Sequence, residues 1–166
     1  TGVQTCALPI SDSEFASRTC SFLDLFRPEP GYLFEVDAVN TIPTAAGFAS
    51  SASGFAALVR ALDELYEWGL DARKLSILAR LGSGSAARSL YDGLVEWHAG
   101  MSPDGMDSFA EPVQTVWPEL HIGLLVVTTA RKGISSRAAM QRTVANSPLY
   151  KAWPDVVAHE IRRAHV

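Results

Sequence analysis

Residues 40–54 read Asn40-Thr41-Ile42-Pro43-Thr44-Ala45-Ala46-Gly47-Phe48-Ala49-Ser50-Ser51-Ala52-Ser53-Gly54, a run dominated by small side chains. A strand-like segment, Tyr32–Val36, precedes this run, and apolar residues at helical spacing follow it from Phe55 to Tyr66. The pattern predicts a strand, a loop and a helix in that order. Unpaired amides at a helix start, the helix dipole and the lack of bulky side chains all favour a bound phosphate there.

The hydroxyl groups at the end of this loop extend the phosphate hypothesis. Ser50 and Ser51 could donate to a phosphate, and Ser51 is our candidate ligand for a metal ion. Composition alone also fits a plain tight turn in which a serine caps the helix. The segment is not a Walker loop, because it contains no Gly-Lys-Ser/Thr. The residues by themselves leave both interpretations open.

Composition and charge exclude several classes of protein. With 166 residues, 48% of them apolar, the chain can bury one sizeable core or parts of two domains. A net charge of −4 argues against nucleic acid or an anionic membrane as the main partner. No apolar run approaches the roughly 20 residues that span a bilayer. The two cysteines have neither metal-ligand spacing nor a disulfide framework, which fits a reducing compartment such as the cytoplasm.

Both ends of the sequence look like additions that do not belong to the native protein. Residues 3–10 and 160–166 resemble translations of a sequencing-library adapter read on its two strands, apart from Arg162. We therefore expect residues 1–10 and 160–166 to be non-native. The remainder is then expected to be an internal piece of a longer protein, incomplete at both ends.

The spacing of apolar residues and the positions of proline, glycine and capping residues predict further helices and strands. The expected helices are Ser13–Phe26, Ser51–Trp68, one capped by Asp71, one capped by Ser135 or Ser136, and one that begins at Ser147-Pro148. The expected strands are Tyr32–Val36, Leu94–Trp97, Ser108–Val113 and His121–Thr128, the last covered on both faces. Trp117-Pro118 is our candidate domain boundary.

A second small-residue turn is Gly82-Ser83-Gly84-Ser85-Ala86-Ala87-Arg88-Ser89. If a helix opens at Ser85, the Ser85 hydroxyl and the Arg88 guanidinium share one face, because they are three residues apart. Such a pair suits a carboxylate, which arginine binds through two parallel hydrogen bonds. The alternative is a Gly-Ser turn with a surface arginine paired to an acidic residue.

A third segment begins Ser135-Ser136-Arg137 and runs through Met140 to Tyr150. A helix start beside an arginine again suits a phosphate. An ordinary capped amphipathic helix explains the same residues.

The remaining polar and aromatic residues give weaker evidence of a functional site. Asp104 and Asp107 fit turns better than metal ligands, and His98 and His121 have no partners at catalytic spacing. The four tryptophans, at positions 68, 97, 117 and 153, are expected to pack in the core and at the domain boundary.

The three turns resemble one known family in the same order along the chain. Pro43–Ala52 resembles the ATP-binding loop of the GHMP kinase superfamily. Its Pro-Thr-Ala-Ala-Gly opening, the segment Arg80–Leu90 and the segment Ser135–Tyr150 resemble the diphosphomevalonate decarboxylases. The resemblance implies an α+β, GHMP-kinase-like two-domain fold. Residues 11–116 would be the latter part of a ribosomal S5 domain 2-like N-terminal domain, and residues 117–159 the start of a ferredoxin-like C-terminal domain.

The resemblance also implies an activity and its residues. The family uses ATP and Mg²⁺ to phosphorylate the 3-hydroxyl of mevalonate 5-diphosphate, and loss of that phosphate with carbon dioxide gives isopentenyl diphosphate. Arg88 and Ser85 are the implied catalytic residues, with Arg88 on the substrate carboxylate. The implied nucleotide-binding residues are Thr44, Ala45, Ala46, Gly47, Ala49, Ser50, Ser51 and Ser53. The implied substrate-binding residues are Ser83, Gly84, Ser85, Ala86, Ala87, Arg88, Ser136, Arg137 and Met140, the last three at the diphosphate.

The sequence departs from the family in two places. The family's catalytic aspartate and its upstream substrate-binding lysine and tyrosine have no counterpart here, so we expect this chain alone to be inactive. Family members are commonly homodimers.

Two alternatives to this function stay open. One alternative is a relative that phosphorylates or decarboxylates mevalonate or its monophosphate. The other is a noncatalytic phosphate binder or an unstable piece.

Overall fold

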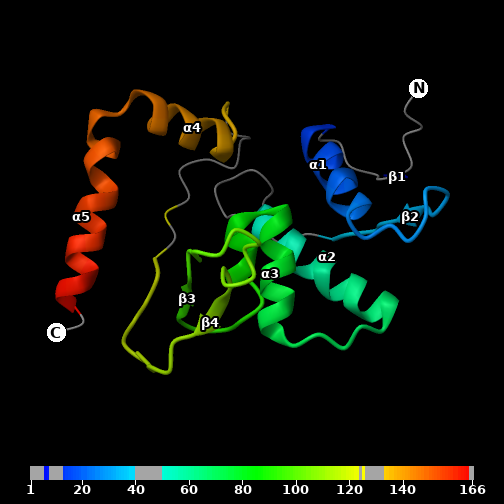
Figure 1. The fold of residues 1–166 in the computed structure, drawn as a ribbon, viewed down its shortest axis with the longest axis horizontal. Helices are drawn as coiled ribbons and strands as arrows, with labels where there is room; N and C mark the ends of the chain where they lie inside the picture. Colours follow the sequence, from blue (N-terminus) through cyan, green and yellow to red (C-terminus); the bar gives the residue numbers. More distant parts are fainter. Residues whose placement is uncertain (1–5, 8–12, 40–49, 124, 126–132, 165–166) are drawn as a thin grey trace.

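The computed structural model describes residues 6–7, 13–39, 50–123, 125 and 133–164 (Figure 1). Its helices are α1 (Ser13–Asp24), α2 (Ser50–Tyr66), α3 (Ala72–Gly82), the 3₁₀ helix η1 (Gly84–Arg88), α4 (Ser136–Asn146) and α5 (Pro148–Ala164). Its strands are β1 (Cys6–Ala7), β2 (Phe34–Glu35), β3 (Val95–Trp97) and β4 (Ala110–Pro112). The combination confirms the α+β class.

The strands form two small sheets. β1 and β2 are parallel, with Cys6 opposite Phe34, and β3 and β4 are antiparallel, with Trp97 opposite Ala110. The strands predicted around β2, β3 and β4 are therefore confirmed, and each is shorter than its predicted range. β1 lies inside the segment that we expected to be non-native, and the structure pairs it with β2.

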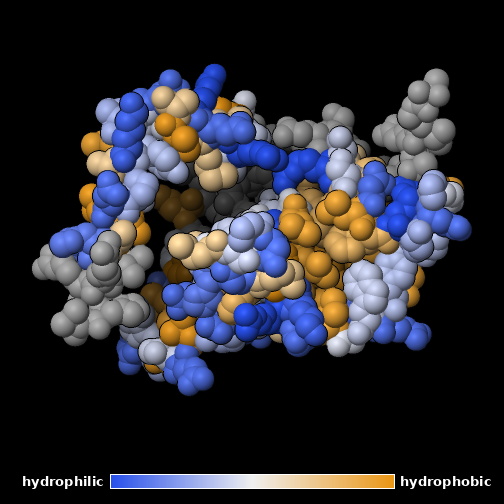
Figure 2. All heavy atoms as spheres, viewed as in Figure 1, coloured by the Kyte–Doolittle hydropathy of each residue, from blue (hydrophilic) through white to orange (hydrophobic). Residues whose placement is uncertain are grey.

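The core lies between α1, α2 and α3, with η1 packed against the last two. Phe55 of α2 is 1% exposed, and its ring centroid lies 5.1 Å from that of Phe22 on α1. A Cβ atom added to Gly82 would lie 2.1 Å from Cδ1 of Phe55. The end of α3 therefore approaches α2 at a distance that only glycine allows. Figure 2 shows apolar side chains gathered over α2 on this face of the molecule.

Local signals account for the ends of these helices. The Asp71 carboxylate accepts a hydrogen bond from the Lys74 amide at 2.8 Å, which confirms the predicted cap of α3. Gly69, with φ of 64°, follows the end of α2. The Ser135 hydroxyl caps α4, and α5 begins at Pro148, both as predicted.

The predicted strand His121–Thr128 is wrong where the structure describes it. Residues 121–123 and 125 lie outside any helix or strand, and Ile122 is 80% and Leu125 90% exposed. Residues 124 and 126–128 lie outside the described part of the chain. A strand needs neighbours for its backbone groups, and no described strand lies beside this segment.

The tryptophans are also more exposed than expected. Each of the four is at least 39% exposed. Trp68 stacks on Tyr66 at the end of α2, and Trp97 lies on the surface beside Gly84.

Across the part of the chain described here, none of the helices combines the length and apolarity that a bilayer span requires.

Candidate active site

The second small-residue turn forms η1, directly after α3. In a 3₁₀ helix the side chains at positions i and i+3 eclipse each other, so Ser85 and Arg88 lie on one face. Both residues line a cavity of about 320 Å³. Ala52 in the first turn of α2 and Val95 of β3 line the same cavity. Two of the three predicted turns therefore face one space.

The Arg88 side chain is exposed and is not held by a counter-charge. Its guanidinium has no hydrogen bond or ion pair with any residue that the structure describes. The alternative of a surface arginine paired to an acidic residue finds no support in the described part of the chain. An arginine that faces a cavity in this state is available to an anion.

The remaining residues of this turn have distinct positions. Ser83 and Ser85 are half-buried, and their Oγ atoms lie 3.5 Å apart. A Cβ atom at Gly84 would lie 2.9 Å from Cη2 of Trp97, so the glycine lets η1 approach β3. Ala86 and Ala87 are 0% exposed. Ala86 belongs to the hydrophobic core, and η1 as a whole packs against α2 and α3. The predicted contact of these two alanines with the substrate stays a prediction.

Tyr91 lines the same cavity. Burial raises the pKa of its phenol, so the hydroxyl remains protonated at neutral pH and can donate a hydrogen bond.

The described part of the predicted nucleotide loop is the start of α2. Ser50 and Ser51 are half-buried there, and the exposed Ser53 donates to the Ser50 carbonyl oxygen at 3.1 Å. The first turn of this 17-residue helix contains no acidic residue, so its positive end is not neutralised from within. Thr44, Ala45, Ala46, Gly47 and Ala49 lie outside the described residues.

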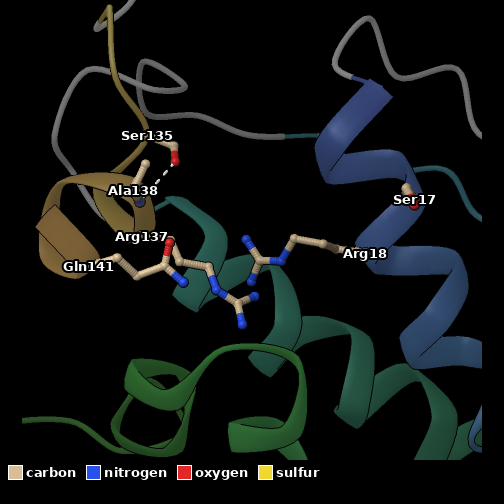
Figure 3. A pocket seen from close by; sticks show the side chains of 6 residues that line it. All are labelled: Ser17, Arg18, Ser135, Arg137, Ala138 and Gln141. Carbon is tan, nitrogen blue, oxygen red and sulfur yellow. Dashed lines mark hydrogen bonds between the residues drawn. The ribbon is translucent and has the colours of Figure 1, made fainter. Parts of the chain in front are cut away.

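The third turn lines a different cavity, of about 390 Å³, between α4 and α1. Arg137 and Gln141 of α4 face Ser17 and Arg18 of α1 across it. Figure 3 shows the guanidinium groups of Arg18 and Arg137 pointing toward each other, and Figure 2 shows strongly hydrophilic side chains in this region. Two cations that converge repel each other, and an anion between them removes that repulsion.

Arg18 is fixed in this position by its neighbours. Its Nη2 atom donates to the Gly82 carbonyl oxygen at 2.8 Å, and its guanidinium lies 5.6 Å from the ring centroid of Phe55. Arg18 was not among the predicted site residues, because a single arginine on a predicted helix carries no local signal of a site. Only the tertiary structure, which places α1 and α4 on two sides of one cavity, brings it to face Arg137.

Ser136 and Met140, which were predicted to bind the substrate together with Arg137, are not among the residues that line this cavity. Ser136 is the exposed first residue of α4, and Ser135, not Ser136, provides the cap and part of the cavity wall. Met140 is 62% exposed and lies on another part of the helix surface.

The two aspartates after β3 form a turn. Asp107 accepts from the amides of Met101 and Ser102, and these hydrogen bonds lower the pKa of its carboxyl. Asp104 accepts from the Met106 amide at 3.0 Å, which likewise lowers its pKa. The turn-forming interpretation is confirmed.

The described residues contain no group of three or more His, Cys, Asp or Glu side chains that could hold a metal ion. His98 pairs instead with Glu111 on the neighbouring strand, at 2.8 Å.

Solved structures share this fold. The complex described as MDDEF with MVAPP, AMPPCP and magnesium matches with a TM-score of 0.72 and 35% identity, over 93% of this chain and 48% of that chain. The mevalonate diphosphate decarboxylase from Enterococcus faecalis matches with a TM-score of 0.70 and 34% identity, over 93% of this chain and 47% of that chain. The fold is therefore the GHMP-kinase-like α+β fold of these enzymes.

The sequence comparisons identify the family. The family model for the diphosphomevalonate decarboxylase-like N-terminal domain matches residues 8–110, and the chain belongs to this family. The diphosphomevalonate decarboxylase of Gibberella zeae is 50% identical over 122 residues. That alignment covers 72% of this chain and 32% of the relative, so the chain spans about a third of the length of that relative.

Proposed function

We propose that the protein to which this chain belongs decarboxylates mevalonate 5-diphosphate in an ATP-dependent reaction that yields isopentenyl diphosphate. The observation that carries the proposal is the pair Ser85 and Arg88, which faces one cavity with the first turn of α2. An unneutralised helix start and an available guanidinium are the groups that a phosphoryl transfer to a carboxylate-bearing substrate requires.

Arg88 would bind the substrate carboxylate through two parallel hydrogen bonds. This contact orients the carbon–carbon bond that breaks so that it lies in line with the departing phosphate. Ser85 would donate to the substrate from the same face of η1, and the Tyr91 hydroxyl, which lines the same cavity, would also donate to it.

Arg18 and Arg137 would hold the diphosphate at the other end of the substrate. Two converging guanidinium groups match the charge of a diphosphate better than that of a neutral hydroxymethyl group or a single phosphate. Ser136 and Met140 would complete this subsite in the presence of substrate. The pair of arginines is the reason to prefer mevalonate diphosphate over mevalonate or its monophosphate.

The nucleotide would lie at the start of α2. The amides of its first turn and the hydroxyls of Ser50 and Ser51 would bind phosphate oxygens, with Thr44 to Ala49 and Ser53 beside them. Mg²⁺ fits this donor set as an ion held by nucleotide phosphates and the Ser51 hydroxyl, since Mg²⁺ commonly binds through phosphates with few protein ligands. Bound Mg²⁺ would neutralise charge on the transferring phosphate.

The organisation around this site follows the family. Residues 11–116 would belong to the N-terminal domain and residues 117–159 to the C-terminal domain, with the substrate between them. The protein would be cytoplasmic and homodimeric, with no nucleic acid or membrane partner.

The test is substrate turnover by the complete protein. Mevalonate, its 5-phosphate and its 5-diphosphate are each supplied with Mg·ATP, and carbon dioxide and ADP are measured. We expect both products in equal amounts from the diphosphate alone. ADP without carbon dioxide, or equal turnover of mevalonate, would contradict the assignment.

A further inference from the structure

Ser76 of α3 is a fully buried serine whose hydroxyl joins two separate backbone segments. Its exposed fraction is 0%. The Oγ atom donates to the Ala87 carbonyl oxygen at 3.0 Å and accepts from the Ala110 amide at 2.8 Å. One side chain therefore connects α3 to η1 and to β4.

Water cannot replace this hydroxyl. Ala87 and Ala110 are both 0% exposed, so their carbonyl and amide groups are shielded from solvent. A serine hydroxyl can donate one hydrogen bond and accept others at the same time, which an alanine at this position cannot do. Without Ser76 the two backbone groups would lose these partners, and the segments would shift to find others.

Both segments form the surroundings of Arg88. Ala87 directly precedes Arg88 in η1, and the Arg88 guanidinium has no hydrogen bond to the described residues, so its position depends on the backbone of η1. Ala110 pairs with Trp97 of β3, the strand that contributes Val95 to the cavity wall. Ser76 thus fixes η1, which carries Arg88, relative to β4 and its neighbour β3.

We propose that Ser76 is a positioning residue that sets the Arg88 guanidinium in its cavity through the Ala87 carbonyl. This inference rests on the proposed function for its consequence in catalysis, whereas its geometric part does not. A serine that only stabilises the fold would reduce activity whether or not Arg88 is present. A positioning residue acts only through Arg88.

The test is a double-mutant cycle in the complete protein with Ser76→Ala and Arg88→Ala. We expect Ser76→Ala to lower kcat/KM by about tenfold or more, mainly through kcat, and to cost less than about twofold in the Arg88→Ala background. An equal loss in both backgrounds would overturn the proposal. So would a folded Ser76→Ala variant that retains kcat/KM within about twofold of the parent.

Two further variants keep the test decisive. Thr19→Val removes another buried hydroxyl, which donates only within α1, to the Phe15 carbonyl oxygen, and it should leave kcat/KM unchanged. Ser76→Cys replaces Ser76→Ala in the cycle if the alanine variant does not fold, because cysteine keeps the volume and a weak donor.

A failure of the proposed function has a separate signature. If the parent protein releases no carbon dioxide from mevalonate diphosphate, the functional assignment is wrong. The positioning of Arg88 by Ser76 is then tested separately, by the NMR resonance of the Arg88 Nε–H group. We then expect Ser76→Ala to move this resonance and Thr19→Val to leave it in place. A resonance that Ser76→Ala does not move would overturn the positioning role.

Discussion

The guanidinium of Arg18 donates to the carbonyl oxygen of Gly82 across 2.8 Å and so connects α1 to the residue at which α3 ends. The same guanidinium faces Arg137 across the cavity between α1 and α4. Gly82 in turn precedes the turn that carries Ser85 and Arg88. One arginine therefore joins the proposed diphosphate subsite to the proposed carboxylate subsite.

Replacement of Arg18 should change the choice of substrate. In the complete protein, Arg18→Gln is expected to raise KM for mevalonate diphosphate by about tenfold or more and to leave turnover of the monophosphate nearly unchanged, because one charged contact to the second phosphate is lost. Arg18→Lys should recover part of the effect. Equal changes for both substrates would argue that Arg18 acts only through the Gly82 hydrogen bond.

Truncation of Arg88 should remove transition-state binding. Arg88→Ala is expected to cost on the order of 2–5 kcal/mol in kcat/KM for mevalonate diphosphate, because the carboxylate is left unpaired in the cavity. The matched control is Arg142→Ala, an exposed arginine on α4, which should be nearly neutral. Activity of Arg88→Ala within a factor of about ten of the parent would contradict the role of Arg88.

Gly82 is predicted to be intolerant of any side chain. Gly82→Ala should lower the free energy of unfolding by about 1–3 kcal/mol, because its Cβ atom would lie 2.1 Å from Phe55. Urea unfolding measures this change. Gly54→Ala is the control, since a Cβ atom there meets Phe15 at an ordinary 3.7 Å in the helix α2 and should be neutral or stabilising.

Coupling with Phe55 would test the cause of that loss. Phe55→Leu should make Gly82→Ala less costly than in the parent, because the ring that collides with the new methyl group is gone. Fully additive losses would show that the two residues do not compete for the same space.

The Asp107 turn should make stability depend on pH in acid. Its folded-state pKa lies below the ordinary value of 3.8, because amides of Met101 and Ser102 donate to the carboxylate. The contribution to stability is therefore fully present above the unfolded-state pKa and is lost as the pH falls through the folded-state pKa. Asp107→Asn should destabilise the protein at neutral pH, and the difference should vanish in strong acid.

Unfolding free energies of the two proteins between neutral pH and about pH 2 measure this difference. Asp155→Asn is the control, because Asp155 is exposed on α5 and makes no hydrogen bond to the described residues. A difference between parent and Asp107→Asn that stays constant across this range would refute the role of the charge.

The sequence correctly predicted helix ends that depend on residues close together in the chain. The Asp71 cap, the Ser135 cap and Pro148 at the start of α5 all depend on contacts within one turn of helix, and all were confirmed. The strand predicted for residues 121–128 is wrong at the described residues 121–123 and 125. An apolar run specifies a buried strand only when neighbouring strands are present to pair with it.

The sequence by itself determined the family, the order of the three turns and the pairing of Ser85 with Arg88 on one face, because each follows from residue identity and short spacing. The tertiary structure alone decided that Arg18 faces Arg137, that Ala86 and Ala87 are packed inside, and that Ser76 joins η1 to β4. These relationships depend on how distant helices and strands pack together. No periodicity within a single segment records that packing.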